Sequence, residues 1–248
     1  MWSSRGSRRQ GCTPPGTSFR LAFCPEVFPN VCNLYSITST QQAIRDLARA
    51  WKDSAGNMPP LPGVFPDYCA PIVRNQVDGR ELAMARWGMP SPVFALKGRN
   101  SDPGVTNVRN VTSPHWRRWL GPENRCVVPF NSFSEHEVLQ DGSRPPVWFA
   151  LSADRPLAFF AGIWTRWTSV RKVKEGETTN DLFAFLTTEA NAEVGAIHPK
   201  AMPVILTTSD DVERWLTAPT TVEALTLQRP LPDGALIVVA RGEKRDGA

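Results

Sequence analysis

Hydrophobic residues fall into short runs separated by Pro-, Gly- and Ser-containing stretches, and the length of these runs predicts mainly β-strands. The expected strands cover residues 69–74, 81–87, 125–130, 147–151, 157–164, 182–188, 202–207 and 235–240. Residues 53–66 and 170–180 are expected to form surface loops, because the first is rich in Pro and Gly and the second is charged.

Three segments instead predict helices. Thr38 and Gln41 form a capping-box pattern, and the apolar residues that follow share one helical face, namely Ala43, Ile44, Leu47, Ala48 and Trp51. Shorter helices are expected over 114–120, with Ser113 as cap and Pro114 at the first position, and over 209–216, with Ser209 as cap. Because strands dominate and do not alternate regularly with helices, the pattern predicts an α+β fold and not a doubly wound sheet.

Residues 1–31 differ from the rest of the chain. They contain many Ser, Gly and Pro residues and show no helical or strand period, so we expect a disordered extension. Three interpretations stay open: an assigned start that lies too early, since Val31 directly precedes Cys32; a leader that is removed; or a transit peptide. The expected division is therefore 1–31 as extension, 32–240 as one catalytic domain, and 241–248 as a polar tail.

Composition limits the function classes. Hydrophobic residues make up 41% of the 248 positions and nine are Trp, which is enough for a substantial core. The longest apolar run, 156–164, is too short to cross a bilayer, so we expect a soluble protein with no membrane contact. The five Cys show no zinc-binding spacing, and we expect neither a metal nor another cofactor. Reduced thiols are the default state for these cysteines, so we expect the protein in the cytoplasm. Net charge is only +4, so a nucleic-acid role requires local clustering of basic residues.

General catalytic signatures such as the G-x-S-x-G elbow, the phosphate-binding Gly loop and H-E-x-x-H are not found in the sequence. Four separate segments carry unusual polar residues beside predicted strands: V-C-N-L-Y-S at 31–36, T-N-V-R-N at 106–110, R-C-V-V-P-F-N-S-F-S-E at 125–135 and I-H-P-K-A-M-P-V-I-L at 197–206.

Together with R-W-G at 86–88, these segments resemble, in order and spacing, the SOS response-associated peptidase (SRAP) family. The resemblance implies a single domain with a mixed, largely antiparallel, barrel-like β core surrounded by short helices. It also implies a catalytic set of Cys32, Asn107, Glu135 and His198. Arg109 and Trp87 match positions along the family's DNA path, and we expect Arg86 and Lys200 to contact DNA as well.

The implied chemistry depends on a free N-terminal Cys. An abasic site in DNA opens to an aldehyde, the α-amine of Cys32 can form a Schiff base with it, and the thiol can then close a five-membered thiazolidine. Both nucleophiles belong to one residue, so ring closure is intramolecular. Glu135 suits the proton transfers if burial raises its pKa, His198 suits proton exchange near neutral pH, and Asn107 can orient the reacting groups. Self-cleavage before Cys32 would use the same groups.

Each assignment has a simpler alternative. A Cys in a hydrophobic protein is usually a core residue, which is our interpretation of Cys69 and Cys126. Trp87 can equally be a core residue, and the spacing of Trp116 and Trp119 on a short helix favours core positions for both. All three lie in a stretch with seven basic side chains that suits a single-strand groove, namely Arg86, Lys97, Arg99, Arg109, Arg117, Arg118 and Arg125.

The chain departs from the family pattern at three places. Leu34 stands where many members have a phosphate-binding Arg, and His136 stands where many have Trp. The segment from His198 to Met202 and Pro203 is one residue longer, so Lys200 would supply a phosphate contact as a point charge. These departures predict altered DNA contacts with the reaction retained.

The first functional hypothesis is therefore an autoproteolytic, thiol-dependent hydrolase with lyase-like chemistry, which acts in the DNA damage response and crosslinks to abasic sites in single-stranded DNA. We expect it to be a monomer that joins the nucleoid when bound to DNA. The alternatives are a non-covalent single-strand binder and a peptidase that acts in trans.

Overall fold

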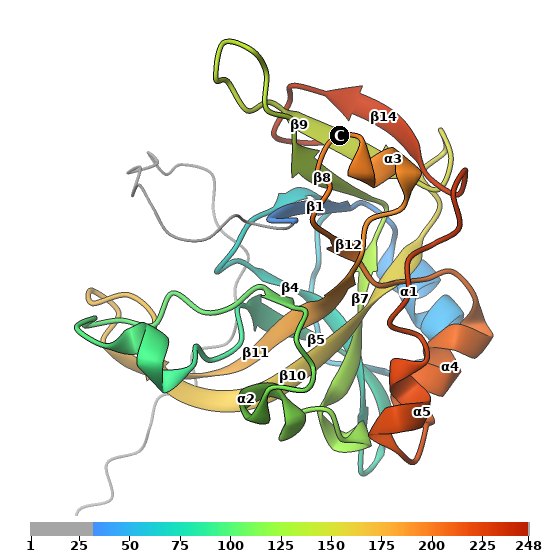
Figure 1. The fold of residues 1–248 in the computed structure, drawn as a ribbon. Helices are drawn as coiled ribbons and strands as arrows, with labels where there is room; N and C mark the ends of the chain where they lie inside the picture. The colour runs from blue at the N-terminus through green and yellow to red at the C-terminus, as the bar shows by residue number, and fades with distance from the viewer. Residues whose placement is uncertain (1–31, 248) are drawn as a thin grey trace, which may run out of the picture.

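A closed five-stranded barrel forms the centre of the computed structural model, which describes residues 32–247 (Figure 1). In order around the barrel, the strands are β11 (Glu177–Thr188), β10 (Ala158–Val170), β7 (Arg125–Phe130), β4 (Cys69–Gln76) and β5 (Gly79–Trp87). Neighbouring strands are antiparallel except where β5 and β11 close the barrel in parallel. The predicted α+β class with a largely antiparallel barrel-like core is confirmed.

A second, antiparallel sheet packs beside the barrel. Its strand order is β14 (Ile237–Arg241), β9 (Pro146–Ala150), β8 (Ser132–His136), β1 (Leu34–Ile37) and β3 (Leu61–Val64). Four two-residue strands extend the barrel sheet: β2 (Lys52–Asp53), β6 (Asn107–Val108), β12 (Met202–Pro203) and β13 (Ile205–Leu206). Since β7 leads into β8 through Asn131 alone, the two sheets share a continuous stretch of chain.

Aromatic side chains join the two sheets. Tyr35 on β1 makes edge contacts with Trp87, Phe160 and Phe185 of the barrel, at centroid distances of 5.1, 5.8 and 6.2 Å. Phe133 on β8 lies 6.0 Å from Phe160. All five side chains are at most 1% exposed, so this cluster is the centre of the core, and aromatic pairs of this geometry stabilise it beyond their buried area.

The helices are short and lie around the sheets: α1 (Gln41–Ala48), α2 (Pro114–Arg117), α3 (Ala192–Gly195), α4 (Ser209–Thr217), α5 (Thr221–Leu225), and the 3₁₀ turns η1 (Val93–Leu96) and η2 (Pro122–Asn124). The cap of α1 is Thr40 and not Thr38, and that of α4 is Thr208 and not Ser209. Trp51 is 68% exposed and not on a buried helical face, because α1 ends at Ala48 and is followed by a left-handed Arg49.

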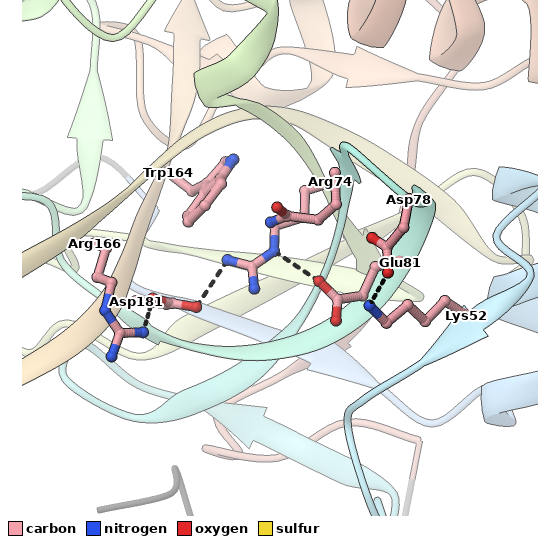
Figure 2. A pocket seen from close by; sticks show the side chains of 8 residues that line it. Lys52, Arg74, Asp78, Glu81, Trp164, Arg166 and Asp181 are labelled. Atoms are coloured by element: carbon pink, nitrogen blue, oxygen red, sulfur yellow. Dashed lines mark hydrogen bonds and ion pairs between the residues drawn. The ribbon is translucent and has the colours of Figure 1, made fainter. Parts of the chain in front are cut away.

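A cluster of charged residues links four of the barrel strands (Figure 2). Arg74 on β4 stacks on Trp164 of β10 and forms ion pairs with Glu81 of β5 and Asp181 of β11, at 3.2 and 2.8 Å. These residues line a pocket of about 330 Å³. None of the site residues expected from the sequence lines this pocket, and its acidic side chains are each paired with a Lys or Arg; Lys52 pairs with Asp78 and Arg166 with Asp181.

Three segments are more ordered than the sequence predicts. The expected loop over 53–66 contains β3, which pairs with β1. The expected loop over 170–180 is a hairpin, since β10 continues to Val170 and β11 begins at Glu177. The tail after β14 returns to the second sheet and buries Asp246, which is 5% exposed. The extension 1–31 lies outside the described residues, and over residues 32–247 no helix is long and apolar enough to span a membrane.

Candidate active site

Cys32 lies two residues before the start of β1, and its backbone nitrogen donates a hydrogen bond of 2.8 Å to Oε1 of Glu135 on β8. The antiparallel register of β1 and β8, in which Leu34 faces Ser134, explains this approach. Cys32 and Glu135 are 0% and 1% exposed, so the contact is shielded from solvent. The nitrogen and the carboxyl group are thus within proton-transfer distance.

Burial raises the pKa of Glu135 from 4.5 to about 8, although the hydrogen bond from the Cys32 nitrogen opposes the increase. The cause is the loss of hydration, which disfavours the carboxylate more than the neutral acid. At neutral pH the side chain is therefore mainly protonated and can donate a proton. An acid kept neutral in this way is typical of catalytic sites.

The thiol of Cys32 must lose a proton in order to react, whereas Glu135 must donate one. Burial raises its pKa well above the ordinary value, and the nearby charge of Glu135 raises it further. Its Sγ lies 3.7 Å from the carbonyl oxygen of Leu34. Because only the thiolate is strongly nucleophilic, this sulfur needs a base to take its proton at the moment of attack.

Asn107 reaches the same residue from the barrel side. It lies on β6, which pairs in parallel with β11, and its Nδ2 donates to the carbonyl oxygen of Cys32 at 3.1 Å. The adjacent Thr106 donates to Oδ1 of Asn33, also at 3.1 Å. Asn107 therefore fixes the backbone of Cys32 without adding charge to the site.

His198 approaches the second carboxyl oxygen of Glu135. It follows α3, and its Nδ1 lies 3.8 Å from Oε2 of Glu135 and 3.3 Å from the carbonyl oxygen of Ala201. Its side chain is 16% exposed, so it connects the buried acid with solvent. The structure therefore brings together all four residues that the sequence named as catalytic; their roles stay predictions.

Two of the four expected DNA contacts are not at the surface. Trp87 is fully buried, stacks on Phe183 and Phe185, and donates from Nε1 to the carbonyl oxygen of Thr106. Its faces are covered by other rings, so it cannot stack on a base, and it supports the segment that carries Asn107. Arg86 is 8% exposed and its guanidinium binds Asp67 and Glu175, which leaves no free fork for phosphate.

The other two, Arg109 and Lys200, are exposed and adjacent. Arg109 donates to the carbonyl oxygens of Lys200 and of Thr188, the latter at 3.1 Å. It therefore ties the segment after β6 to the His198 loop, which sequence reasoning missed because a backbone contact leaves no residue pattern. The expected basic and aromatic stretch is also divided by the fold: Arg125 is fully buried, and Trp116 and Trp119 are core residues at 7% and 5% exposure.

The structure changes the meaning of the departure at Leu34. Its side chain is only 2% exposed on β1, so an Arg at this position would bury a charge and would not simply reach phosphate. His136, which follows Glu135, is exposed at the end of β8. Of the two Cys taken as core residues, Cys126 is fully buried and Cys69 is partly buried.

Sequence reasoning also missed Thr106 and Asn33, which link the Asn107 segment to the residue after Cys32. Thr106 lies in the polar segment 106–110 and Asn33 in the segment 31–36. Their position next to Asn107 and Cys32 in the sequence was the only available signal. Within residues 32–247, no group of three or more His, Cys, Asp or Glu side chains could hold a metal ion.

Comparison with protein families finds a match over residues 31–240 to the family described as SOS response associated peptidase (SRAP). Among curated proteins, the chain is 30% identical over 166 residues to the abasic site processing protein YoqW of Bacillus subtilis, a match that covers 65% of this chain and 68% of the relative. It is 28% identical over 179 residues to the abasic site processing protein YoaM of the same organism, covering 69% and 74%.

Solved structures share the fold. A protein from Bordetella bronchiseptica matches with a TM-score of 0.64 and 23% identity, covering 83% of this chain and 97% of the other. A protein from Bacteroides thetaiotaomicron matches with a TM-score of 0.62 and 21% identity, covering 83% and 90%. At this identity the likeness concerns the fold alone.

Proposed function

The chain belongs to the SOS response associated peptidase (SRAP) family, and we propose that it processes abasic sites in single-stranded DNA through a covalent thiazolidine link to Cys32. The names of its curated relatives support abasic-site processing. The observation that carries the covalent step is the 2.8 Å contact between the nitrogen of Cys32 and a carboxyl group whose pKa is raised to about 8.

The first step needs the nitrogen of Cys32 as a free amine. The amine attacks the aldehyde carbon of the opened sugar, and a proton moves from nitrogen to the former carbonyl oxygen, which yields a carbinolamine. Glu135 in its acid form then protonates the hydroxyl group, water leaves, and an iminium ion remains with Glu135 as carboxylate. A carboxyl group that is mainly neutral before the reaction suits this role.

The second step closes the ring. The Glu135 carboxylate takes the thiol proton, sulfur attacks the iminium carbon, and the nitrogen keeps its one hydrogen as a neutral secondary amine. Glu135 returns to its acid form, so the acid is regenerated. Since amine and thiol stand on one residue that Asn107 holds through the carbonyl oxygen, little further ordering is required.

The same groups can expose the amine by self-cleavage. The Cys32 sulfur attacks the carbonyl carbon of residue 31 while His198 takes the thiol proton. The peptide bond to the Cys32 nitrogen breaks, and that nitrogen receives a proton from Glu135, 2.8 Å away. Water then hydrolyses the thioester, and the proton on His198 returns to Glu135, whose Oε2 is 3.8 Å away.

The decisive experiment incubates protein that begins at Cys32 with an abasic single strand and analyses the products on a denaturing gel. We expect an adduct that resists denaturation and that is lost in Cys32→Ala. Cys126→Ala is the matched control, because that thiol is also buried but is not at the site, and this variant should keep the adduct.

Other outcomes favour the alternatives. Salt-sensitive DNA binding with no adduct would indicate a non-covalent binder, and turnover of a peptide in trans would indicate a general peptidase. Intact-mass measurement adds a second check: a preparation that keeps residues 1–31 and still crosslinks fully would contradict the mechanism, because its Cys32 nitrogen is an amide.

A further inference from the structure

Residues 242–247 run along the second sheet from β9 to β3, and we call them the C-terminal strap. The Gly242 nitrogen donates a hydrogen bond to the carbonyl oxygen of Pro146 on β9. Nε1 of Trp148, on the same strand, donates to the carbonyl oxygen of Glu243 at 2.7 Å. Further along, the Asp246 nitrogen donates to the Pro62 carbonyl oxygen of β3 at 2.9 Å. Figure 1 shows the end of the chain at this sheet.

Asp246 binds the two strands that carry the active site. Its carbonyl oxygen accepts a 2.7 Å bond from Oγ of Ser36 on β1, and its carboxylate accepts a 2.6 Å bond from Oγ of Ser132 on β8. Ser36 and Ser132 stand directly opposite each other in the β1–β8 ladder. One residue of the strap therefore holds both members of a registered pair.

The carboxylate of Asp246 has its own counter-charge. Arg155 donates from Nε and Nη2 to its two oxygens at 2.7 and 2.8 Å, a bidentate arrangement that fixes the carboxylate plane. Burial by itself would raise the pKa of Asp246, but the bonds from Arg155 and Ser132 hold that pKa below its usual range. The group is thus a paired, charged anchor and not a solvated tail residue.

The ladder that Asp246 binds is short. β1 and β8 form three registered pairs, from Leu34–Ser134 to Ser36–Ser132. Cys32 precedes this ladder by two residues and Glu135 follows it by one. At about 3.3 Å per residue, the two reacting groups lie roughly 10–13 Å along the strands from the anchored pair. A small change in the alignment of these strands is therefore transmitted to the contact between the Cys32 nitrogen and Glu135.

We propose that Asp246 is a positioning residue: by binding Ser36 and Ser132 together, the strap sets the alignment of β1 against β8 and thereby the distance from the Cys32 nitrogen to the Glu135 carboxyl group. The proposal rests on the proposed function for its catalytic consequence. It extends the functional domain beyond residue 240, where the family match ends. In the Arg155–Asp246 pair only the carboxylate is buried, so its value lies in fixing the position of Asp246 more than in stability.

The test compares Asp246→Ala and Asp246→Asn in protein that begins at Cys32. For Asp246→Ala we expect the rate of adduct formation at saturating abasic DNA to fall by about 10-fold or more, because a misplaced acid loses proximity catalysis. The affinity for undamaged single strands should change less than about 2-fold, since no exposed cation is removed. Asp246→Asn keeps an acceptor for Ser132 and should recover part of the rate.

A second readout does not need DNA. The Glu135 titration, followed by carboxyl ¹³C NMR, should move toward the ordinary range by about one pH unit in Asp246→Ala, because a loosened site admits water. If wild-type protein forms no adduct, the proposed function fails, and this comparison still decides the role of the strap. An unchanged Glu135 midpoint together with an unchanged adduct rate would overturn the proposal.

Two further variants separate positioning from stability. Ser132→Ala removes one bond, keeps the Arg155–Asp246 pair, and should slow adduct formation by about 3-fold or more. Glu213→Gln breaks the partly exposed ion pair with Arg80 at α4, away from the site, and is the control for a general loss of stability. Equal slowing in Glu213→Gln and Asp246→Ala at matched melting temperatures would contradict the proposal.

Discussion

Glu135 shows how burial of a single side chain serves chemistry at a cost in stability. It is 1% exposed, and the imidazole Nδ1 of His198, which is partly accessible to solvent, lies 3.8 Å from its Oε2. Its pKa of about 8 keeps it protonated at neutral pH, as an acid catalyst requires. The same shift means that the folded state binds a proton that the unfolded state releases.

We predict that Glu135 makes the folded state less stable as pH rises. In the unfolded chain Glu135 ionises near pH 4.5, and in the folded chain near pH 8, so the free energy of unfolding falls between these two values. The full shift corresponds to about 5 kcal/mol, an upper bound. Urea unfolding at pH 5 and pH 8 should show a smaller loss of stability in Glu135→Gln than in wild type.

Glu177→Gln, on the exposed start of β11, is the matched control and should behave as wild type. A wild-type protein and a Glu135→Gln variant with the same pH dependence would show that the buried carboxyl group does not titrate as described.

At the scale of elements, the His198 loop is attached to β6 through Arg109. The guanidinium binds two backbone carbonyl oxygens, those of Thr188 and Lys200, and leaves the Lys200 side chain exposed. Arg109 and Lys200 therefore have different roles although both are basic. The Arg holds the segment with His198 in place, whereas the Lys is available to a phosphate group.

This difference predicts two distinct phenotypes. Lys200→Ala should weaken single-strand binding and reduce the slope of log K against log salt by about 0.7, the value for one lost phosphate contact. Arg109→Ala should mainly slow adduct formation, because the His198 loop loses its attachment. Fluorescence anisotropy over a salt series, with adduct rates at saturating DNA, separates the two, and identical effects would contradict the assignment.

At the scale of the whole molecule, the parallel pairing of β5 and β11 closes the barrel, and the cluster around Arg74 bridges strands on both sides of that closure. Arg74 is 10% exposed in its side chain and pairs with both Glu81 and Asp181, at 8% and 17%. Removing the Arg would leave Glu81 without its ion-pair partner and Asp181 with only the exposed Arg166, whereas removing an exposed partner would cost little.

We predict that Arg74→Ala lowers the free energy of unfolding by about 3–5 kcal/mol, as is typical of breaking one side of a buried ion pair. Lys52→Ala, which removes the more exposed pair with Asp78, should cost less than about 1 kcal/mol. Urea unfolding measures both, and similar losses in the two variants would mean that the Arg74 cluster is effectively solvated.

Strands with continuous apolar character were predictable from the sequence. The bounds of β7, residues 125–130, agree with the prediction, and β4, β5 and β9 agree to within two residues at each end. β1 and β8 were missed, because buried Ser36, Ser132 and Ser134 interrupt their apolar pattern. Two of these Ser residues are buried because they bind Asp246, more than a hundred positions away in the chain.

The sequence by itself determined the fold class, the resemblance to one family and the identity of the four candidate catalytic residues, since these depend on local pattern and on motif order. Only the tertiary structure decided which charged and aromatic side chains are buried: Trp87 and Arg86 are in the interior, Arg109 binds backbone, and Asp246 binds both strands of the site. Burial and pairing depend on strands that meet across the barrel and the second sheet, so no local pattern encodes them.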